Sequence, residues 1–301
     1  MRSFWSRIRG KSPGLDKASE RWRSTLGAAA QVPYYSRWKK ELHRAQHATD
    51  AEARSEALLR LPVVELDYLF QHFYLFREKA TVAGKPQDGS SLWPCEARIA
   101  VVSPWFHVGG GAKLLLKPEL EELRRFAPEV IAGPADALEA LATAGDWQQD
   151  NCLFAMTALA GVGTPLLSQS ARLRLWRAFG VPVYVQLRGF QGELFARECE
   201  AHNGLHFDAA NVIFQRRPSG ELLLTSLGNT RHTVLRLATR LEASIETRIC
   251  DCGLSSPRLM NLQAVTGRAL EHALPSAPSL TALAAAVSDT QGTRAGRLPS
   301  R

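Results

Sequence analysis

The chain has 301 residues, of which 45% are apolar and 22% are charged, and its formal net charge is +8. This balance excludes an intrinsically disordered chain and is typical of a globular protein with one large or two small cores. The most apolar stretch, residues 153–167, is too short and too rich in glycine and proline to span a bilayer, and the N-terminus lacks the apolar core of a secretory signal. We therefore expect no transmembrane segment and a cytoplasmic location.

The positive charge is concentrated at the N-terminus, where residues 1–44 hold eleven Lys or Arg and three Asp or Glu. Aromatic and aliphatic side chains alternate with these charges, namely Phe4, Trp5, Ile8, Trp22 and Trp38. The pattern suits contact with an anionic surface, and it suits equally a solvated arm whose aromatic residues dock on the body of the protein. No nucleic-acid-binding motif accompanies it, so a nucleic-acid partner is not expected.

Helices are the first predicted elements along the chain. Apolar residues spaced by threes and fours predict helices over residues 16–60, with a break at Val32-Pro33-Tyr34-Tyr35. We assign residues 1–60 to a basic helical N-terminal arm. A further helix with one broad apolar face is predicted over residues 65–78.

Short β-rich runs then alternate with helical stretches. Strands are predicted at residues 98–102, 130–132, 153–159 and 181–185, and helices at residues 118–126, 135–143 and 168–179. Such alternation predicts an α/β fold with a mostly parallel sheet flanked by helices.

The C-terminal third has a different character. Residues 212–215 and 221–225 flank the turn Pro218-Ser219-Gly220 and predict an antiparallel hairpin. We assign residues 61–268 to one core domain that ends in a small antiparallel subdomain. Residues 269–301, rich in Ala, Ser and Pro, are expected to be a partly disordered tail.

Metal-ligand residue types gather in two stretches of this C-terminal third. Cys199, His202 and His206 lie within eight positions of one another, and Cys250 and Cys252 form a Cys-x-Cys-Gly turn. Thiolates and imidazoles at these separations can converge on one tetrahedral zinc if the intervening chain folds back as a hairpin. We favour Cys199, His206, Cys250 and Cys252 as a closed structural zinc site that staples the subdomain, with His202 as a competitor for the histidine position. The alternative is a set of buried free cysteines with two solvent-exposed histidines.

Several motifs occur in one order over residues 160–268. They are residues 161–166, residues 188–193 followed by Glu198-Cys199 and Gly204-Leu205-His206, residues 220–227, residues 250–253, Pro257-Arg258-Leu259 and Gly267-Arg268. In this order the stretch resembles the C-terminal half of the large domain of phenylacetate-CoA ligase and its relatives in the adenylate-forming superfamily. The Cys-x-Cys-Gly turn is part of the resemblance.

The resemblance implies an acetyl-CoA synthetase-like large domain and an acid–thiol ligase. Such an enzyme adenylates a carboxylic acid with ATP and Mg²⁺ and passes the acyl group to CoA or to a carrier-protein thiol. It places the turn Gly163-Thr164-Pro165 near adenine, His107 beside the acyl pocket and Lys85 in the remnant of a phosphate loop. It assigns catalytic positions to Glu193, beside Mg²⁺, and to Arg236, within reach of a ribose or a phosphate.

Both catalytic candidates have a structural alternative. Glu193 suits equally a surface carboxylate paired with Arg188 or Arg197, and Arg236 suits a structural ion pair. The triple glycine that follows His107 suits a plain strand-to-helix connection.

The sequence also departs from the family pattern. The phosphate loop is reduced to residues 81–86, and Leu241 stands where a carboxylate would hold the ribose hydroxyls. The family's C-terminal domain, with its catalytic lysine, is not expected in the residues that follow Arg268. These departures favour an alternative function, namely a catalytically inactive homologue that acts as a scaffold for a nucleotide, an acyl group or a protein partner of the same pathway.

Overall fold

The computed structural model describes an α/β protein built on one large mixed sheet. Its eleven strands follow the order β2-β1-β3-β4-β5-β6-β7-β11-β10-β9-β8. The described residues are 15–77, 97–102, 112–115, 120–144, 153, 155–161, 166–189, 193–228 and 232–265.

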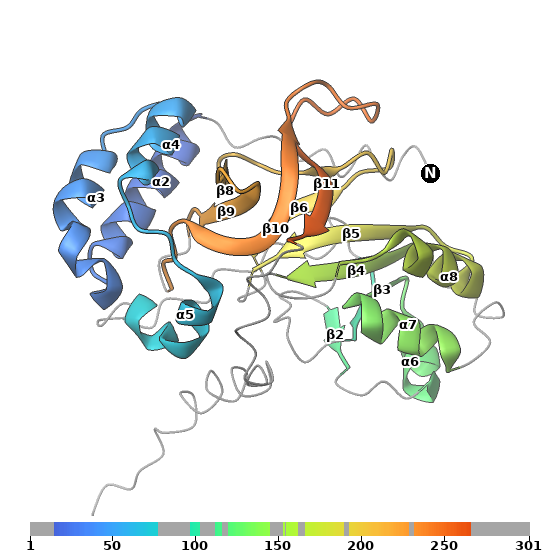
Figure 1. Ribbon diagram of the computed structural model, residues 1–301. Coiled ribbons are helices and arrows are strands. Elements are labelled where there is room, and N and C mark those ends of the chain that lie inside the picture. Colours follow the sequence, from blue (N-terminus) through green and yellow to red (C-terminus); the bar gives the residue numbers. More distant parts are fainter. Residues whose placement is uncertain are drawn as a thin grey trace, which may run out of the picture.

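The N-terminal helices form a separate layer against one end of the sheet (Figure 1). They are α2 (Leu15–Ala29), the 3-10 helix η1 (Pro33–Trp38), α3 (Lys39–Ala45), α4 (Ala51–Leu59), α5 (Leu66–Gln71) and the 3-10 helix η2 (Phe73–Phe76). The predicted break falls where Pro33 opens η1 after an extended Val32. The helix predicted over residues 65–78 is shorter than expected, because the backbone leaves the helical conformation at His72.

The helical layer is held to the sheet by a hydrophobic cluster. Trp22, Tyr35 and Phe76 are fully buried there. The Tyr35 hydroxyl accepts a hydrogen bond from the Leu235 N–H at 2.7 Å and donates to the Leu235 carbonyl oxygen at 3.2 Å. Trp22 donates its indole N–H to the Ala45 carbonyl oxygen at 2.8 Å. Of the two interpretations of the N-terminal aromatics, docking on the body is therefore correct for Trp22, whereas Phe4, Trp5 and Ile8 lie outside the described residues.

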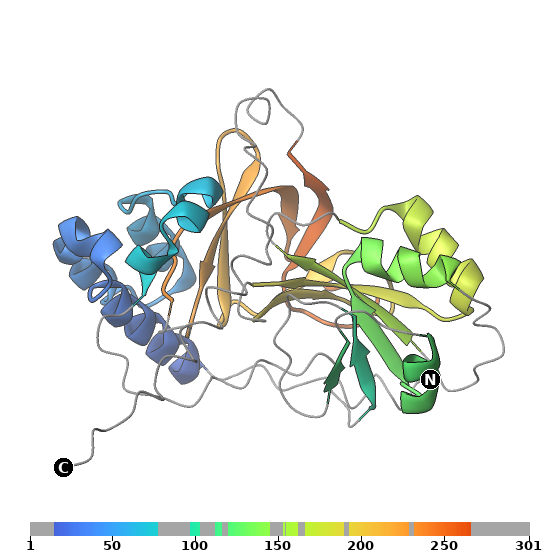
Figure 2. The same ribbon diagram turned by 90° about the horizontal axis from the view of Figure 1, so that it is seen from below.

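The first half of the sheet is parallel. Its strands are β1 (Ile99–Val101), β2 (Ala112–Leu114), β3 (Val130–Gly133), β4 (Ala155–Gly161) and β5 (Val183–Arg188), and its helices are α6 (Leu120–Phe126), α7 (Ala135–Thr143) and α8 (Gln169–Phe179). Helices α7 and α8 lie side by side on one face (Figures 1 and 2). Ser168 caps α8 by accepting the Ala171 N–H at 3.1 Å, and Gly180 ends it at a φ of 66°. The strand and helix predictions for this half are confirmed within a few residues.

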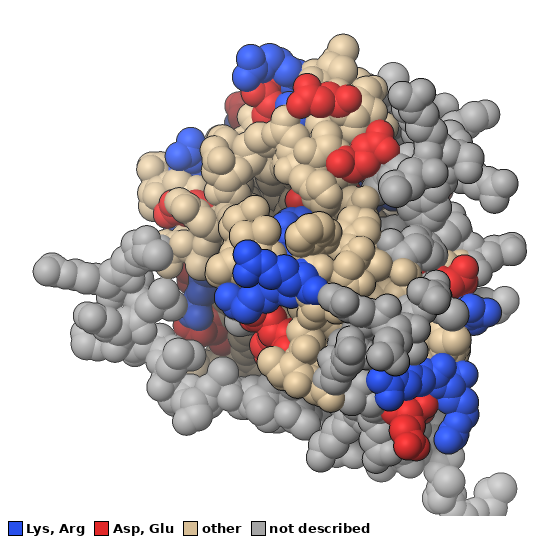
Figure 3. Space-filling model, turned by 90° about the vertical axis from the view of Figure 1, so that its right-hand side faces the viewer, with Lys and Arg blue, Asp and Glu red and all other residues tan. Residues whose placement is uncertain are grey.

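Charges on the side of α6, α7 and α8 are mixed. Basic and acidic side chains lie next to one another on this face (Figure 3). The ion pairs Lys113–Glu122 and Arg174–Glu139 join them. Positive charge on this side is therefore partly neutralised by neighbouring carboxylates.

The second half of the sheet is antiparallel. It comprises β6 (Leu194–Glu198), β7 (Leu205–His206), β8 (Val212–Arg216), β9 (Glu221–Ser226), β10 (Leu237–Glu246) and β11 (Arg258–Ala264). The predicted hairpin corresponds to β8 and β9 and is confirmed. The prediction of a mostly parallel sheet is wrong: the sheet is mixed, because β6 returns beside β5 without a crossover helix and begins a long antiparallel run.

Within the antiparallel half, β6 and β11 are joined by strand β7, which is only two residues long. His206 pairs with Arg197 on one side and Arg258 on the other, and Leu205 pairs with Glu198 and Leu259. The two strand pairs that involve β7 therefore contain fewer paired residues than any other strand pair in the sheet.

Gly204 leads the chain into β7. Its φ is +83°, and a Cβ there would lie 2.7 Å from the Leu259 carbonyl oxygen. Only glycine allows β7 to approach β11 so closely.

No helix in the described part of the chain combines the length and the apolar character needed to cross a bilayer.

Candidate functional site

Four potential metal ligands converge at strand β7. Cys199 follows β6, His206 belongs to β7, and Cys250 and Cys252 lie in the turn between β10 and β11. Their ligand atoms all lie within 4.8 Å of one another. Cys199, His206 and Cys250 are 3–4% exposed, so the cluster is largely closed to solvent. The structure thus brings together the four residues that the sequence analysis favoured.

The spacing within the cluster matches a tetrahedral zinc site. The Sγ atoms of Cys199 and Cys250 are 3.8 Å apart, and Cys252 Sγ lies 3.5 Å from His206 Nε2. A tetrahedron with Zn–S bonds of about 2.3 Å and a Zn–N bond of about 2.0 Å has an S–S edge of about 3.8 Å and an S–N edge of about 3.5 Å. These two distances therefore match edges of a zinc tetrahedron, and all four ligand atoms lie within 4.8 Å of one another.

The imidazole of His206 is oriented for ligation through Nε2. Nδ1 lies 3.1 Å from the Ser256 carbonyl oxygen and 2.9 Å from the Ser256 hydroxyl. A carbonyl oxygen only accepts, so Nδ1 carries the hydrogen and the lone pair of Nε2 faces Cys252. Burial lowers the pKa of His206, which favours the neutral ring that a metal needs.

The thiols of the cluster are poorly suited to ionise without a cation. Burial raises the pKa of Cys199 to about 12, and it raises the pKa of Cys252 as well. Burial also opposes ionisation of Cys250, but hydrogen bonds from the Cys252 backbone and from the neighbouring thiols outweigh it and lower its pKa overall. A bound divalent cation would supply the positive charge that three adjacent thiolates require.

The guanidinium of Arg258 lies beside the cluster. Arg258 is 5% exposed and donates from Nη1 to the Asn203 carbonyl oxygen at 3.2 Å. Its charge lowers the pKa values of His206 and Cys250, after the larger effects of burial and hydrogen bonding. Three thiolates around a divalent ion leave one net negative charge, which the buried guanidinium of Arg258 offsets.

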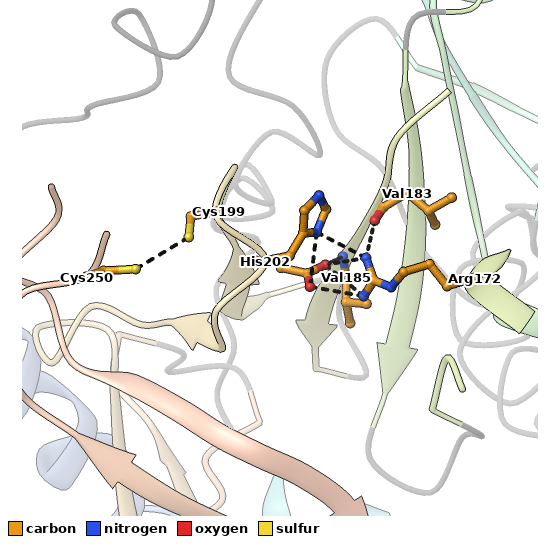
Figure 4. A network of polar contacts seen from close by, with 7 residues as sticks. Arg172, Val183, Val185, Cys199, His202 and Cys250 are labelled. Carbon is orange, nitrogen blue, oxygen red and sulfur yellow. Dashed lines mark hydrogen bonds and ion pairs between the residues drawn. The ribbon is translucent and has the colours of Figure 1, made fainter. Parts of the chain in front are cut away.

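A polar network anchors the loop that carries Cys199. Glu198 is 8% exposed and accepts hydrogen bonds from both terminal nitrogens of Arg172 at 3.0–3.1 Å and from the Val185 N–H at 2.9 Å. Figure 4 shows Arg172 and His202 converging on this carboxylate while Cys199 points the opposite way, toward Cys250. The network thereby links α8 and β5 to the first residue of the metal cluster.

His202 belongs to this network rather than to the metal cluster. Its Nδ1 lies 3.1 Å from Arg172 Nη1 and 3.3 Å from Glu198 Oε1, and its ring stacks on Tyr184 at a centroid distance of 4.9 Å. The competition between the two histidines is therefore resolved geometrically in favour of His206.

Arg236 lies at the start of β10 and faces the helical layer. Its φ is +54°, in the left-handed region. Its guanidinium donates to the carbonyl oxygens of Leu59 and Leu61, whereas the buried Nε has no hydrogen-bond partner among the described residues. Burial lowers its pKa, and the like charge of Arg217 lowers it further. Arg236 therefore stabilises the junction between helix α4 and the sheet and keeps one donor unused.

Leu241 is the residue that the resemblance places where a ribose carboxylate is expected. It is 3% exposed and packs in the core under the sheet, paired with Ala264 of β11. A carboxylate at this position would be buried, so the backbone here does not present residue 241 to a solvent-filled site.

Glu193 lies immediately before β6. Its carbonyl oxygen accepts the Gly189 N–H at 2.8 Å. Burial lowers the pKa of Arg188 to about 10, and the charge of Glu193 opposes that shift. Glu193 therefore lies close enough to Arg188 for their charges to interact, as the structural alternative of an ion pair requires. Its role beside Mg²⁺ stays a prediction.

The remaining predicted site residues lie outside the described residues. They are Lys85, His107, Gly163, Thr164 and Pro165.

Sequence reasoning missed the residues that support the metal cluster. Arg172 and Glu198 are 26 positions apart and Arg258 follows Asn203 by 55, so no local spacing connects them. The only available signal was the position of Glu198 directly before a predicted ligand.

Comparisons with known proteins identify the fold. No family model and no curated protein sequence matches the chain. Among solved structures, 2-hydroxyisobutyryl-CoA ligase in complex with 2-HIB-AMP and CoA in the thioesterification state is similar, with a TM-score of 0.57 and 14% sequence identity over 81% of this chain and 66% of that chain. An open conformation of the same ligase gives a TM-score of 0.54 and 14% identity over 81% and 67% of the two chains. The anthranilate CoA ligase AuaEII gives 0.39 and 14% over 54% and 39%.

The chain therefore has the fold of adenylate-forming ligases. It spans about two thirds of the length of the 2-hydroxyisobutyryl-CoA ligase chains that it matches.

Proposed function

We propose that the protein is a divergent adenylate-forming enzyme, which activates a carboxylic acid with ATP and Mg²⁺ and passes the acyl group to CoA or to a carrier-protein thiol. The observation that carries this proposal is the fold match over 81% of the chain to a ligase bound to an acyl adenylate and CoA. The order of motifs over residues 160–268 supports the phenylacetate-CoA ligase-like branch of the superfamily.

Within this proposal Arg236 and Glu193 are the catalytic residues. The Nε of Arg236 has no hydrogen-bond partner among the described residues, and a guanidinium at this motif position suits contact with a phosphate or a ribose oxygen. Glu193 is proposed to hold Mg²⁺. The turn Gly163-Thr164-Pro165 is proposed to contact adenine, with His107 beside the acyl group and Lys85 beside the phosphates.

A second candidate function is favoured by Leu241. The ribose carboxylate is replaced by a core side chain, and two donors of Arg236 are already bound by backbone carbonyls. These observations suit a scaffold that keeps the fold and binds a nucleotide, an acyl group or a protein of the same pathway without catalysis.

We further propose that Cys199, His206, Cys250 and Cys252 bind a structural zinc. The distances, the orientation of His206 and the compensating charge of Arg258 support it. Four protein ligands leave no open position for water, so the ion would stabilise the fold and take no part in acyl transfer.

The test of the function is ATP–pyrophosphate exchange with a panel of aryl and fatty acids. The proposal expects exchange with at least one acid and a loss of about 100-fold or more in Arg236→Ala, compared with Arg177→Ala on the exposed side of α8 as the matched control. Thermal unfolding of both variants separates a loss of chemistry from a loss of structure. If no acid supports exchange and calorimetry detects nucleotide binding, the scaffold is the correct alternative. If neither is detected, both nucleotide-dependent functions are excluded.

A further inference from the structure

Helix α3 presents a solvent face made entirely of basic residues. Lys39, Lys40, His43 and Arg44 of the helix are exposed, as is His47 in the turn that follows it, whereas Leu42 and Ala45 are buried on the opposite side. At 100° per residue the four exposed helical side chains fall within an arc of about 140°. The rings of His43 and His47 are 5.4 Å apart, which confirms that they are neighbours. Together with the exposed Arg37 of η1, these five residues are named the basic face.

Nothing in the described structure neutralises the basic face. No ion pair between described residues involves Arg37, Lys39, Lys40 or Arg44. Glu41, the acidic residue of α3, is partly buried on the other side of the helix.

The acidic residues of the neighbouring segment are already paired. Glu65 lies 3.2 Å from Arg217, and Asp67 pairs with Arg240 of the sheet. Glu65 and Asp67 thus pair with the sheet, and the exposed carboxylates of the layer, Glu20, Asp50, Glu52 and Glu56, form no ion pair with the basic face among the described residues.

Aromatic side chains adjoin the basic face. Tyr34 contacts Trp38, Tyr68 and Phe76, with ring centroids 6.0, 5.6 and 4.4 Å apart. Tyr68 is 39% exposed. Amphipathic rings beside lysine and arginine are the composition of surfaces that rest in the headgroup region of a membrane.

We propose that the basic face and its neighbouring tyrosines dock the protein on an anionic lipid surface. Charge complementarity selects an anionic partner, and the chain's net charge of +8 adds long-range attraction. Helix α3 lies on the outer side of the helical layer, away from the sheet (Figure 1), so a planar surface can reach it. Single-stranded nucleic acid fits less well, because the face is the convex side of a helix and Tyr34 already stacks on neighbouring rings. The proposal does not rest on adenylation.

The test is sedimentation of the full chain with vesicles of phosphatidylcholine alone or with 30% phosphatidylglycerol. The variant Lys39→Gln/Lys40→Gln/Arg44→Gln is compared with Arg124→Gln/Arg125→Gln/Arg177→Gln, which removes the same charge from exposed positions on the side of α6 and α8. Each basic residue near an anionic surface contributes about fivefold in affinity, so the first variant should bind about 100-fold more weakly. The second should stay within about threefold of the unaltered chain, and pure phosphatidylcholine should not bind.

Three outcomes would overturn the proposal. Equal binding of both variants would assign the attraction to the rest of the chain, residues 1–14 included. Absence of vesicle binding would remove the lipid surface as the partner. Binding of a labelled single-stranded oligonucleotide, measured by fluorescence anisotropy, is the third. If no vesicle binds but the oligonucleotide does, and the first variant weakens that binding, nucleic acid is the partner instead.

Discussion

The two halves of the sheet are held together in different ways. In the parallel half, β4 and β5 pair over six consecutive positions, and α7 and α8 pack beside them. In the antiparallel half, β6 pairs with β5 at three positions but is joined to β11 through β7, which pairs at two positions on each side. Longer strand pairing and helix packing hold the parallel half, whereas few backbone pairs hold the junction at β7, where the Cys/His cluster lies.

This difference supports the proposal of a structural metal at β7. Cys199 follows the last strand before the junction, His206 lies in β7, and Cys250 and Cys252 come from the hairpin beyond it. One ion bound to all four would cross-link both sides of the narrow strand. The parallel half, with its longer ladders, needs no such cross-link.

The largest expected effect follows removal of a metal ligand. Cys250→Ser should lose the bound zinc and about 5 kcal/mol or more of unfolding free energy, because metal binding is linked to folding. Metal content by mass spectrometry and thermal unfolding measure the two effects. Cys152→Ser, at a cysteine that is not one of the four proposed ligands, should keep one zinc per chain. Equal metal content in both variants would show that Cys250 is not a metal ligand.

A buried charge in the antiparallel half should have the next largest effect. Leu241→Asp would place an unpaired carboxylate in the core and cost about 3–5 kcal/mol, whereas the volume-conserving Leu241→Met should cost less than about 1.5 kcal/mol. Urea unfolding of the two variants gives the difference. If Leu241→Asp were as stable as the unaltered chain and bound ATP more tightly, residue 241 would face the nucleotide and its place in the core would be wrong.

Breaking the anchor of the Cys199 loop should be less costly. Arg172→Met leaves Glu198 buried without its cation, and we expect a loss of about 2–3 kcal/mol, reduced from a fully buried pair because Arg172 is partly exposed. Arg172→Met/Glu198→Gln removes both charges and should recover part of that loss. Zinc affinity should fall in the single variant, since Glu198 positions Cys199. The two side chains do not interact if the losses of unfolding free energy in Arg172→Met alone and in Glu198→Gln alone add up to the loss in the double variant.

The smallest expected effect concerns the backbone of Arg236. Its φ of +54° disfavours any residue with a Cβ, so Arg236→Gly should be about 1 kcal/mol more stable than Arg236→Ala. Both variants lose the same guanidinium bonds to Leu59 and Leu61, which isolates the backbone contribution. Chemical denaturation measures it, and a more stable alanine variant would place Arg236 in an ordinary extended conformation.

The same contrast between the halves decides how much the sequence could predict. Strand–helix alternation predicted β1, β3, β4 and β5, but the edge strand β2 was missed, because its three residues are too few to show a period. An antiparallel subdomain was predicted, but its continuity with the same sheet was missed, because β7 has two residues. Strand β10 was missed for another reason: its register shifts between Ala238 and Glu242, around the positive φ of Arg240, and this irregularity interrupts the alternation of a strand.

The candidate site was also predicted only in part: its proposed ligands were predicted, but the residues that orient them were not. Cysteine and histidine are few and chemically distinctive, so their spacing predicted that Cys199, His206, Cys250 and Cys252 would meet. The residues that orient them, Arg172, Glu198 and Arg258, are common types whose contacts depend on the completed fold. The choice between His202 and His206 likewise needed the direction of each ring, which spacing does not provide.

The measurement that tests the central account most directly is hydrogen exchange of the zinc-loaded chain before and after chelation. If the ion joins β6 to β11 across β7, amides of β7 and of residues 258–259 in β11 should lose protection on chelation, while β4 and β5 keep theirs. Unchanged protection of β7 and β11 after complete removal of the metal would contradict the account.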